Sequence, residues 1–232
     1  FTFYLMLAIN FLIRVWRFQQ KLWWIGFTVS LTLGLYSSGL IFLLVVMPVI
    51  FLAPYWAKLS WKSIYVFGLI SICIALLFFF IWALTVSSSL GISLWDALGL
   101  RYILKAFNQA PPLYVYVLNL VIILFPWLFW LRIYRLYRDV DRDESFHFVV
   151  VWFLSLVVVL GILSLTSLDA LLPIYPAFSL IIARIYYQGF SRKLDVAPIV
   201  VFMVLVGLLM IVIPYNCQWL SLPQWVGQVS PF

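Results

Sequence analysis

Only a few side chains in this sequence could bind or activate an anionic substrate, because just 9% of the residues are charged. Arg101 and Lys105 could face a phosphate, which cationic side chains bind strongly. Asp169 and Tyr175 flank a proline, and a carboxylate there could serve as a general base. These four residues are the predicted substrate-binding residues. No residue is predicted to be catalytic, and no metal or cofactor is expected.

Pro173 and Pro176 lie three residues apart within a stretch apolar enough for a bilayer. Proline lacks an N–H and its ring clashes with the preceding turn, so the pair cannot sit in an uninterrupted helix. In hydrocarbon the freed carbonyls need polar partners from neighbouring helices or a cavity. The pair therefore predicts a broken helix that faces the interior, with Tyr175 directed into a cavity. A kinked helix that faces lipid is the alternative, since proline is common in membrane helices.

Apolar residues recur at near-helical spacing within residues 88–112, with Asp96, Arg101 and Lys105 between them. This pattern predicts an amphipathic helix in the membrane interface, outside the cytoplasm. The helix either caps the helical bundle or lines a cavity entered by a lipid-linked substrate. Ser87, Ser88, Ser89 and Gly91 are expected to end the apolar segment before it.

The densest cluster of charge lies in residues 138–147, where acidic residues alternate with arginine. The spacing lacks the central glycine and the twelfth-position glutamate of a calcium loop. Such a loop is typically a solvated turn whose charges pair with one another. It predicts no metal site, despite the presence of His147.

The composition predicts an integral membrane protein, because 67% of the residues are hydrophobic, against about 45–50% in soluble domains. The net charge of +7 lies in short loops and gives no nucleic-acid-binding patch. At about 20 residues per crossing, the sequence predicts an all-α polytopic bundle of eight membrane segments. They are roughly residues 1–13, 22–37, 40–56, 64–87, 113–132, 148–166, 170–188 and 197–214. The first is cut short at Phe1, which favours a fragment or a processed product.

The basic residues predict how this bundle is oriented. With alternating crossings, all 14 Lys and Arg except Arg101 and Lys105 fall on one side, which the positive-inside rule makes cytoplasmic. The membrane domain then spans residues 1–214, and residues 215–232 form an extracytoplasmic tail. The expected location is a bacterial inner membrane or its equivalent.

Three blocks resemble GT-C membrane glycosyltransferases, the branch of the protein O-mannosyltransferases and lipid A aminoarabinose transferases. The first runs from Trp23-Trp24-Ile25-Gly26 to Ser38-Gly39. The second is Pro111-Pro112-Leu113-Tyr114-Val115-Tyr116, with Pro126-Trp127 after it. The third contains Ser164, Leu168 and Leu171-Leu172-Pro173-Ile174-Tyr175-Pro176-Ala177. Together they span most of the chain, in the order of the family.

The resemblance implies sugar transfer from a polyprenyl-phosphate donor at the outer membrane face. In that family the catalytic carboxylate lies in a first outer loop, which has no counterpart here. The eight segments would then form the second half of the membrane domain, without the catalytic half. Membrane lipids, a polyprenyl-phosphate sugar and further membrane subunits are the expected partners.

Two alternatives remain. The turn where relatives carry Lys-Gly-Pro reads Tyr36-Ser37-Ser38-Gly39, and residues 166–169 hold no Lys or Arg. Such losses favour a degenerate relative that serves as a structural subunit of a larger membrane complex. An unrelated channel or transporter is the weakest alternative, because transport pathways usually contain intramembrane ionisable groups.

Overall fold

The computed structural model describes residues 1–101, 103–104, 112–130, 133–134, 137–138, 140–163, 168–189 and 200–208. Throughout this part of the chain the protein is all-helical and contains no strand, which confirms the predicted all-α class. Lys105, the turn at residues 164–167 and the tail at residues 215–232 lie outside the described residues.

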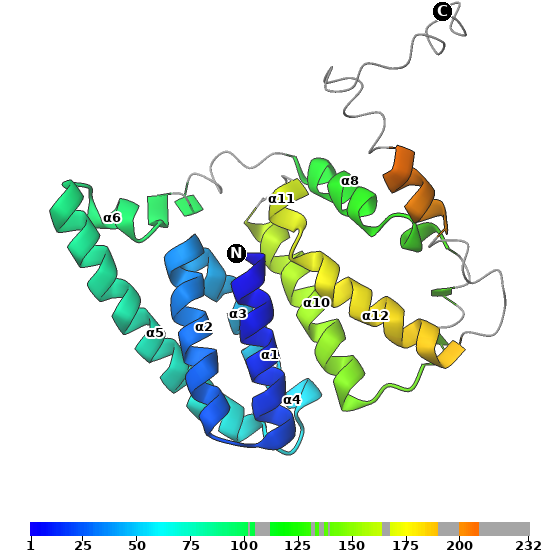
Figure 1. The fold of residues 1–232 in the computed structure, drawn as a ribbon, viewed down its shortest axis with the longest axis horizontal. Coiled ribbons are helices and arrows are strands. Elements are labelled where there is room, and N and C mark those ends of the chain that lie inside the picture. Colours follow the sequence, from blue (N-terminus) through cyan, green and yellow to red (C-terminus); the bar gives the residue numbers. More distant parts are fainter. Residues whose placement is uncertain are drawn as a thin grey trace, which may run out of the picture.

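Three helices that alternate in direction form the N-terminal part of the bundle (Figure 1). They are α1 (Thr2–Phe18), α2 (Leu22–Ser38) and α3 (Leu40–Phe51). Gln19 adopts the left-handed conformation after α1, and its N–H donates to the carbonyl of Val15. This ending turns the chain back, so that α2 packs along α1.

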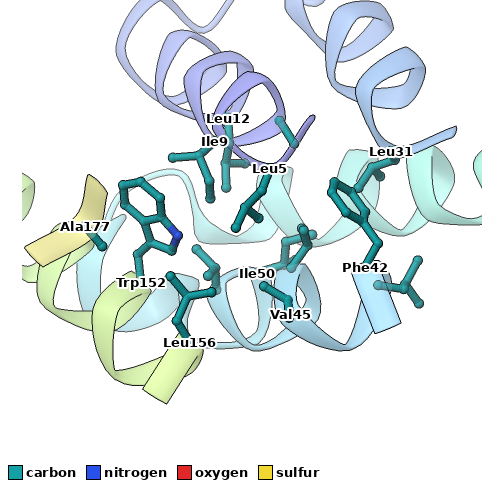
Figure 2. Close-up of a cluster of buried hydrophobic side chains, with 14 of the residues drawn as sticks. Leu5, Ile9, Leu12, Leu31, Phe42, Val45, Ile50, Trp152, Leu156 and Ala177 are labelled. Atoms are coloured by element: carbon teal, nitrogen blue, oxygen red, sulfur yellow. The ribbon is translucent and has the colours of Figure 1, made fainter. Parts of the chain in front are cut away.

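The main core lies where α1, α3 and α10 (Glu144–Ile162) meet. Leu5, Ile9 and Leu12 recur along one face of α1 and point toward α3 and α10 (Figure 2). Trp152 and Leu156 reach the same core from α10, and both are fully buried. The N-terminal helices and α10 therefore form one packed unit, although more than ninety residues separate them in sequence.

The second and third predicted segments, residues 22–37 and 40–56, form a tight helical hairpin. Gly39 is the single residue between α2 and α3, and its N–H donates to the carbonyl of Leu35 at 2.8 Å. Its backbone has φ 64° and ψ −155°, a region that only glycine populates readily. A Cβ on Gly39 would also lie 3.4 Å from the carbonyl oxygen of Leu98. The turn thus depends on glycine for its conformation.

We expect Gly39→Ala to destabilise the protein by about 1–3 kcal/mol, the cost of holding a Cβ-bearing residue in this region. Reversible unfolding in mixed detergent micelles would measure the loss. Gly207→Ala is the matched control, because a Cβ on Gly207 meets nothing within 4 Å. In that helical position alanine should be neutral or slightly stabilising. Equal stability of the two variants would contradict the strained turn.

The longest helix is α5 (Trp61–Leu90), with 30 residues. Of the residues expected to end this helix, Gly91 does so, but the three serines Ser87, Ser88 and Ser89 do not. The hydroxyls of Ser88 and Ser89 both donate to the carbonyl of Thr85. Each hydroxyl therefore has its hydrogen-bond partner within the helix, and the helix can continue. The helix ends instead at Gly91, which is left-handed with φ 64°.

Among the described residues, two helices, α5 and α10, are long and apolar enough to cross a membrane by length and composition. Several shorter helices occupy the other predicted segments. The stretch 40–56 divides at Leu52 into α3 and α4 (Ala53–Trp56), and Pro54 lies in the first turn of α4. The stretch 113–132 contains α8 (Leu113–Leu124), which ends before Pro126, and the 3₁₀ helix η1 (Trp127–Phe129). Residues 200–208 are helical as well.

The remaining helices complete the fold around α10. Helix α6 (Leu94–Ala97) follows α5 within the predicted interfacial stretch. After α10 come α11 (Leu168–Leu171) and α12 (Ile174–Gly189), and α12 runs antiparallel to α10 and packs against it (Figure 1).

Candidate functional site

The proline pair interrupts the chain as predicted. Helix α11 ends at Leu171 and α12 begins at Ile174, so Leu172 and Pro173 separate the two helices. Pro176 falls in the first turn of α12, where its missing N–H would have had no partner within the helix. The N–H of Tyr175 donates to the carbonyl of Leu172 at 3.1 Å. The prediction of a broken helix is therefore confirmed.

One side of this break faces the interior. Four side chains around the break are buried: Leu171, Pro173, Ile174 and Ala177. All of them except Pro173 belong to the main core. Ala177 lies near Trp152 of α10, as Figure 2 shows. The predicted inward orientation therefore holds for this side of the break.

The other side of the break lines an open groove of about 620 Å³ between α12 and η1. Tyr175 and further residues of α12 form one wall at helical spacing, and Trp127 contributes from η1. The lining residues are Trp127, Tyr175, Phe178, Ser179, Ile182, Ala183, Tyr186 and Tyr187. Trp127 and Tyr186 meet edge to face, with ring centroids 5.4 Å apart. Tyr175 thus lines an open groove rather than the enclosed interior cavity that its sequence position predicts.

The chemistry of this groove is apolar and aromatic. None of its lining side chains carries a formal charge at neutral pH. The hydroxyl of Ser179 donates to the carbonyl of Pro176 at 2.9 Å, which satisfies it within its own helix. Such walls suit a hydrocarbon chain. They supply no cation for a phosphate, because phosphates in low dielectric need cationic or amide donors.

The other predicted binding residues are not gathered here. Arg101 pairs with Asp96 beside α6, with Nε and Oδ1 3.1 Å apart, and neither residue lines the groove. Asp169 belongs to α11, but its side chain is not among those described, and Lys105 lies outside the described residues altogether. Of the four candidates, only Tyr175 is placed in the groove.

The charged residues of the 138–147 loop make a long-range contact. Asp143 caps α10 by accepting from the N–H of Phe146, and its other carboxylate oxygen lies 2.8 Å from Nη2 of Arg184 on α12. Nearby, Arg17 of α1 contacts the hydroxyl of Ser145 at 3.4 Å. The interpretation of a self-paired loop is therefore wrong for Asp143. Its position just before a helical run is the sequence signal that could have identified the cap.

Within the described ranges, no group of three or more His, Cys, Asp or Glu side chains gathers that could hold a metal ion. Comparison with protein-family models, with curated proteins and with solved structures finds no match for this chain. The candidate site therefore rests on the groove beside the broken helix and on the chemistry of its walls.

Proposed function

We propose that this chain is part of a GT-C-like membrane glycosyltransferase, in which the groove of α12 holds the lipid chain of a polyprenyl-phosphate-linked sugar. The observation that carries the proposal is an uncharged aromatic groove beside the proline-broken helix. Isoprenoid chains are apolar and branched, and aromatic walls offer them large contact area without hydrogen bonds to satisfy. The carboxylate that activates the acceptor is proposed to lie outside this groove.

The proposal includes the eight-segment topology with its basic loops in the cytoplasm. Arg17 ends α1 and Arg184 lies near the end of α12, and both contact the first residues of α10. These two arginines therefore meet at one end of the bundle, as the positive-inside rule requires of them. The aromatic residues at that end, Trp16, Trp56 and Phe148, pack against one another.

Photocrosslinking tests the groove. We expect p-benzoylphenylalanine at Tyr187 to react with radiolabelled polyprenyl phosphate in membranes at several times the yield found at Tyr55. Both are exposed tyrosines, but only Tyr187 lines the groove, so Tyr55 of α4 is the matched control. Unlabelled polyprenyl phosphate should compete with the crosslink, whereas a phospholipid should not.

A variant that fills the groove sharpens the test. Ala183→Trp places a large ring among the lining residues and should reduce the yield at Tyr187 without affecting Tyr55. Equal yields at the two tyrosines, or equal competition by a phospholipid, would mean that the groove is an ordinary lipid-facing surface. The proposed function would then fail.

A structural subunit of a larger membrane complex is the second candidate. The observation that favours it is that no cationic side chain lines the groove and that Arg101 lies outside it, beside Asp96. In that case the broad exposed apolar face of α5, which includes Leu77, would pack against another chain. Photocrosslinks from Leu77 to a discrete protein, together with no polyprenyl crosslink at Tyr187, would favour this function over the first.

A further inference from the structure

A second, smaller pocket lies at the end of the bundle away from the Asp143–Arg184 pair. It has a volume of about 260 Å³ and is lined by the α2–α3 turn, by Phe79 and Trp82 of α5 and by the α6 region. In Figure 1 the stretch that contains α6 runs from the upper end of α5 toward the upper end of α2. The close approach of Gly39 and the Leu98–Gly99 backbone holds the α6 region over the turn. The pocket is thus formed by four separate elements.

Aromatic rings form one wall of this pocket. Tyr36 and Trp82 have ring centroids 5.4 Å apart, and Phe79 stacks on Trp82 at 5.7 Å. Phe79 is fully buried, whereas Tyr36 and Trp82 remain partly exposed. The faces of tryptophan and tyrosine attract cations that lie within about 6 Å of the ring centre. The accessible part of this wall can therefore stabilise a positive group.

A carboxylate faces the same space. Asp96 lines the pocket and accepts a hydrogen bond from the hydroxyl of Ser93 at 2.6 Å. Its side chain remains 36% exposed, and a carboxylate offers about four acceptor sites, so it can accept further hydrogen bonds. Arg101, its ion-pair partner, is 70% exposed and has room to contact another anion. A negative and a positive group thus stand side by side at the mouth.

We propose that this pocket binds the ethanolamine-phosphate headgroup of a membrane lipid. The ammonium enters the pocket, where it donates to Asp96 and lies against Tyr36 and Trp82. The phosphate stays outside, against Arg101. A primary ammonium fits better than a quaternary one, because only the former can donate hydrogen bonds to the carboxylate.

Size and surroundings favour a lipid as the source of this headgroup. The pocket is slightly smaller than the roughly 300–1,000 Å³ of sites for drug-sized ligands, so it admits a headgroup and excludes the acyl chains. Phe78 and Ile81 of α5 expose apolar side chains beside Phe79 and Trp82, where acyl chains can lie. This proposal requires that the protein lies in a membrane but not that it transfers a sugar. Its test is therefore independent of the function proposed for the groove on α12.

The test uses the purified chain, stripped of lipid and mixed with equal amounts of phosphatidylethanolamine and phosphatidylcholine of identical acyl chains. Retained lipid is measured by native mass spectrometry. We expect a preference of about tenfold for phosphatidylethanolamine, in line with a charge-assisted hydrogen bond. Asp96→Asn should abolish the preference. Glu144→Gln, which removes one negative charge at the start of α10, should retain it.

The carboxylate of Asp96 also helps to hold α6, because it accepts a hydrogen bond from the hydroxyl of Ser93, the residue that precedes this helix. Ala97→Trp is therefore the second variant, since it keeps both charges and fills the pocket from α6; it too should abolish the preference. Equal retention of the two lipids by the unmodified chain, or a preference that survives both variants, would overturn the proposal. Binding of soluble phosphoethanolamine as tight as that of the lipid would overturn the lipid as its source. If soluble phosphoethanolamine competes only at far higher concentrations than the lipid, the result supports a lipid as the source of the headgroup.

Discussion

In intact cells, a cysteine in place of Ser89 is expected to react with an impermeant thiol reagent, whereas one in place of Lys62 is expected to remain unlabelled. The two residues are exposed near opposite ends of α5. At 1.5 Å per residue, the 30 residues of this helix extend about 45 Å, beyond the roughly 30 Å of a bilayer core. Both positions should therefore reach the aqueous boundary, on opposite sides.

This experiment needs a cysteine-free background, which Cys73→Ala and Cys217→Ala provide. Permeabilising the cells should make Lys62→Cys react as strongly as Ser89→Cys, which controls for local accessibility. A third cysteine at Asp141 should behave like the one at Lys62, because both lie in predicted cytoplasmic loops. Labelling of Lys62→Cys in intact cells would reverse the proposed orientation. Labelling of both ends would show that α5 does not cross.

Trp56→Ala is expected to destabilise the protein by about 3–5 kcal/mol, the range for removing a large buried aromatic side chain. Trp56 has 0% of its surface exposed, and its indole N–H donates to the carbonyl of Val49 at 3.0 Å. Its ring meets those of Trp16 and Phe148 edge to face, at 5.6 and 4.8 Å between centroids. Its removal leaves a cavity where α1, α4 and α10 join.

Reversible unfolding in mixed detergent micelles measures this loss. Trp95→Ala is the matched control, because Trp95 is 63% exposed and the same atoms are removed. The control should cost less than about 1 kcal/mol, as do most surface substitutions. Losses that differ by less than about 0.5 kcal/mol between the two variants would show that the Trp56 contacts contribute little.

Features that depend on local sequence were predictable. Apolar composition indicated helices, the short connection between segments 22–37 and 40–56 indicated a tight turn, and Pro173 with Pro176 indicated the break between α11 and α12. Each follows from a backbone restriction that acts within one turn. The three serines at 87–89 led to a wrong prediction of the helix end. The hydroxyls of Ser88 and Ser89 donate to the carbonyl of Thr85, and the helix continues.

Features that depend on packing between distant segments were not predictable from spacing. Tyr175 was identified as lining a cavity, but Trp127 reaches the same groove from η1, and no periodicity links the two. Arg184 pairs with Asp143 because α10 and α12 run antiparallel, which the charges alone do not indicate. Arg101 similarly lies beside Asp96, away from the groove on α12 that Tyr175 lines, and its spacing in the sequence does not indicate this separation.

The contact between Asp143 and Arg184 has a consequence for the order in which the chain is made. The two residues are 41 positions apart, so at 5–20 residues per second Arg184 is synthesised about 2–8 s after Asp143. Arg17 is already present when Ser145 appears, and their contact can form at once. During biogenesis the carboxylate of Asp143, at the start of α10, therefore has no contact with Arg184 until α12 has been synthesised. The contact of α12 with the start of α10 therefore forms later than the contact of α1.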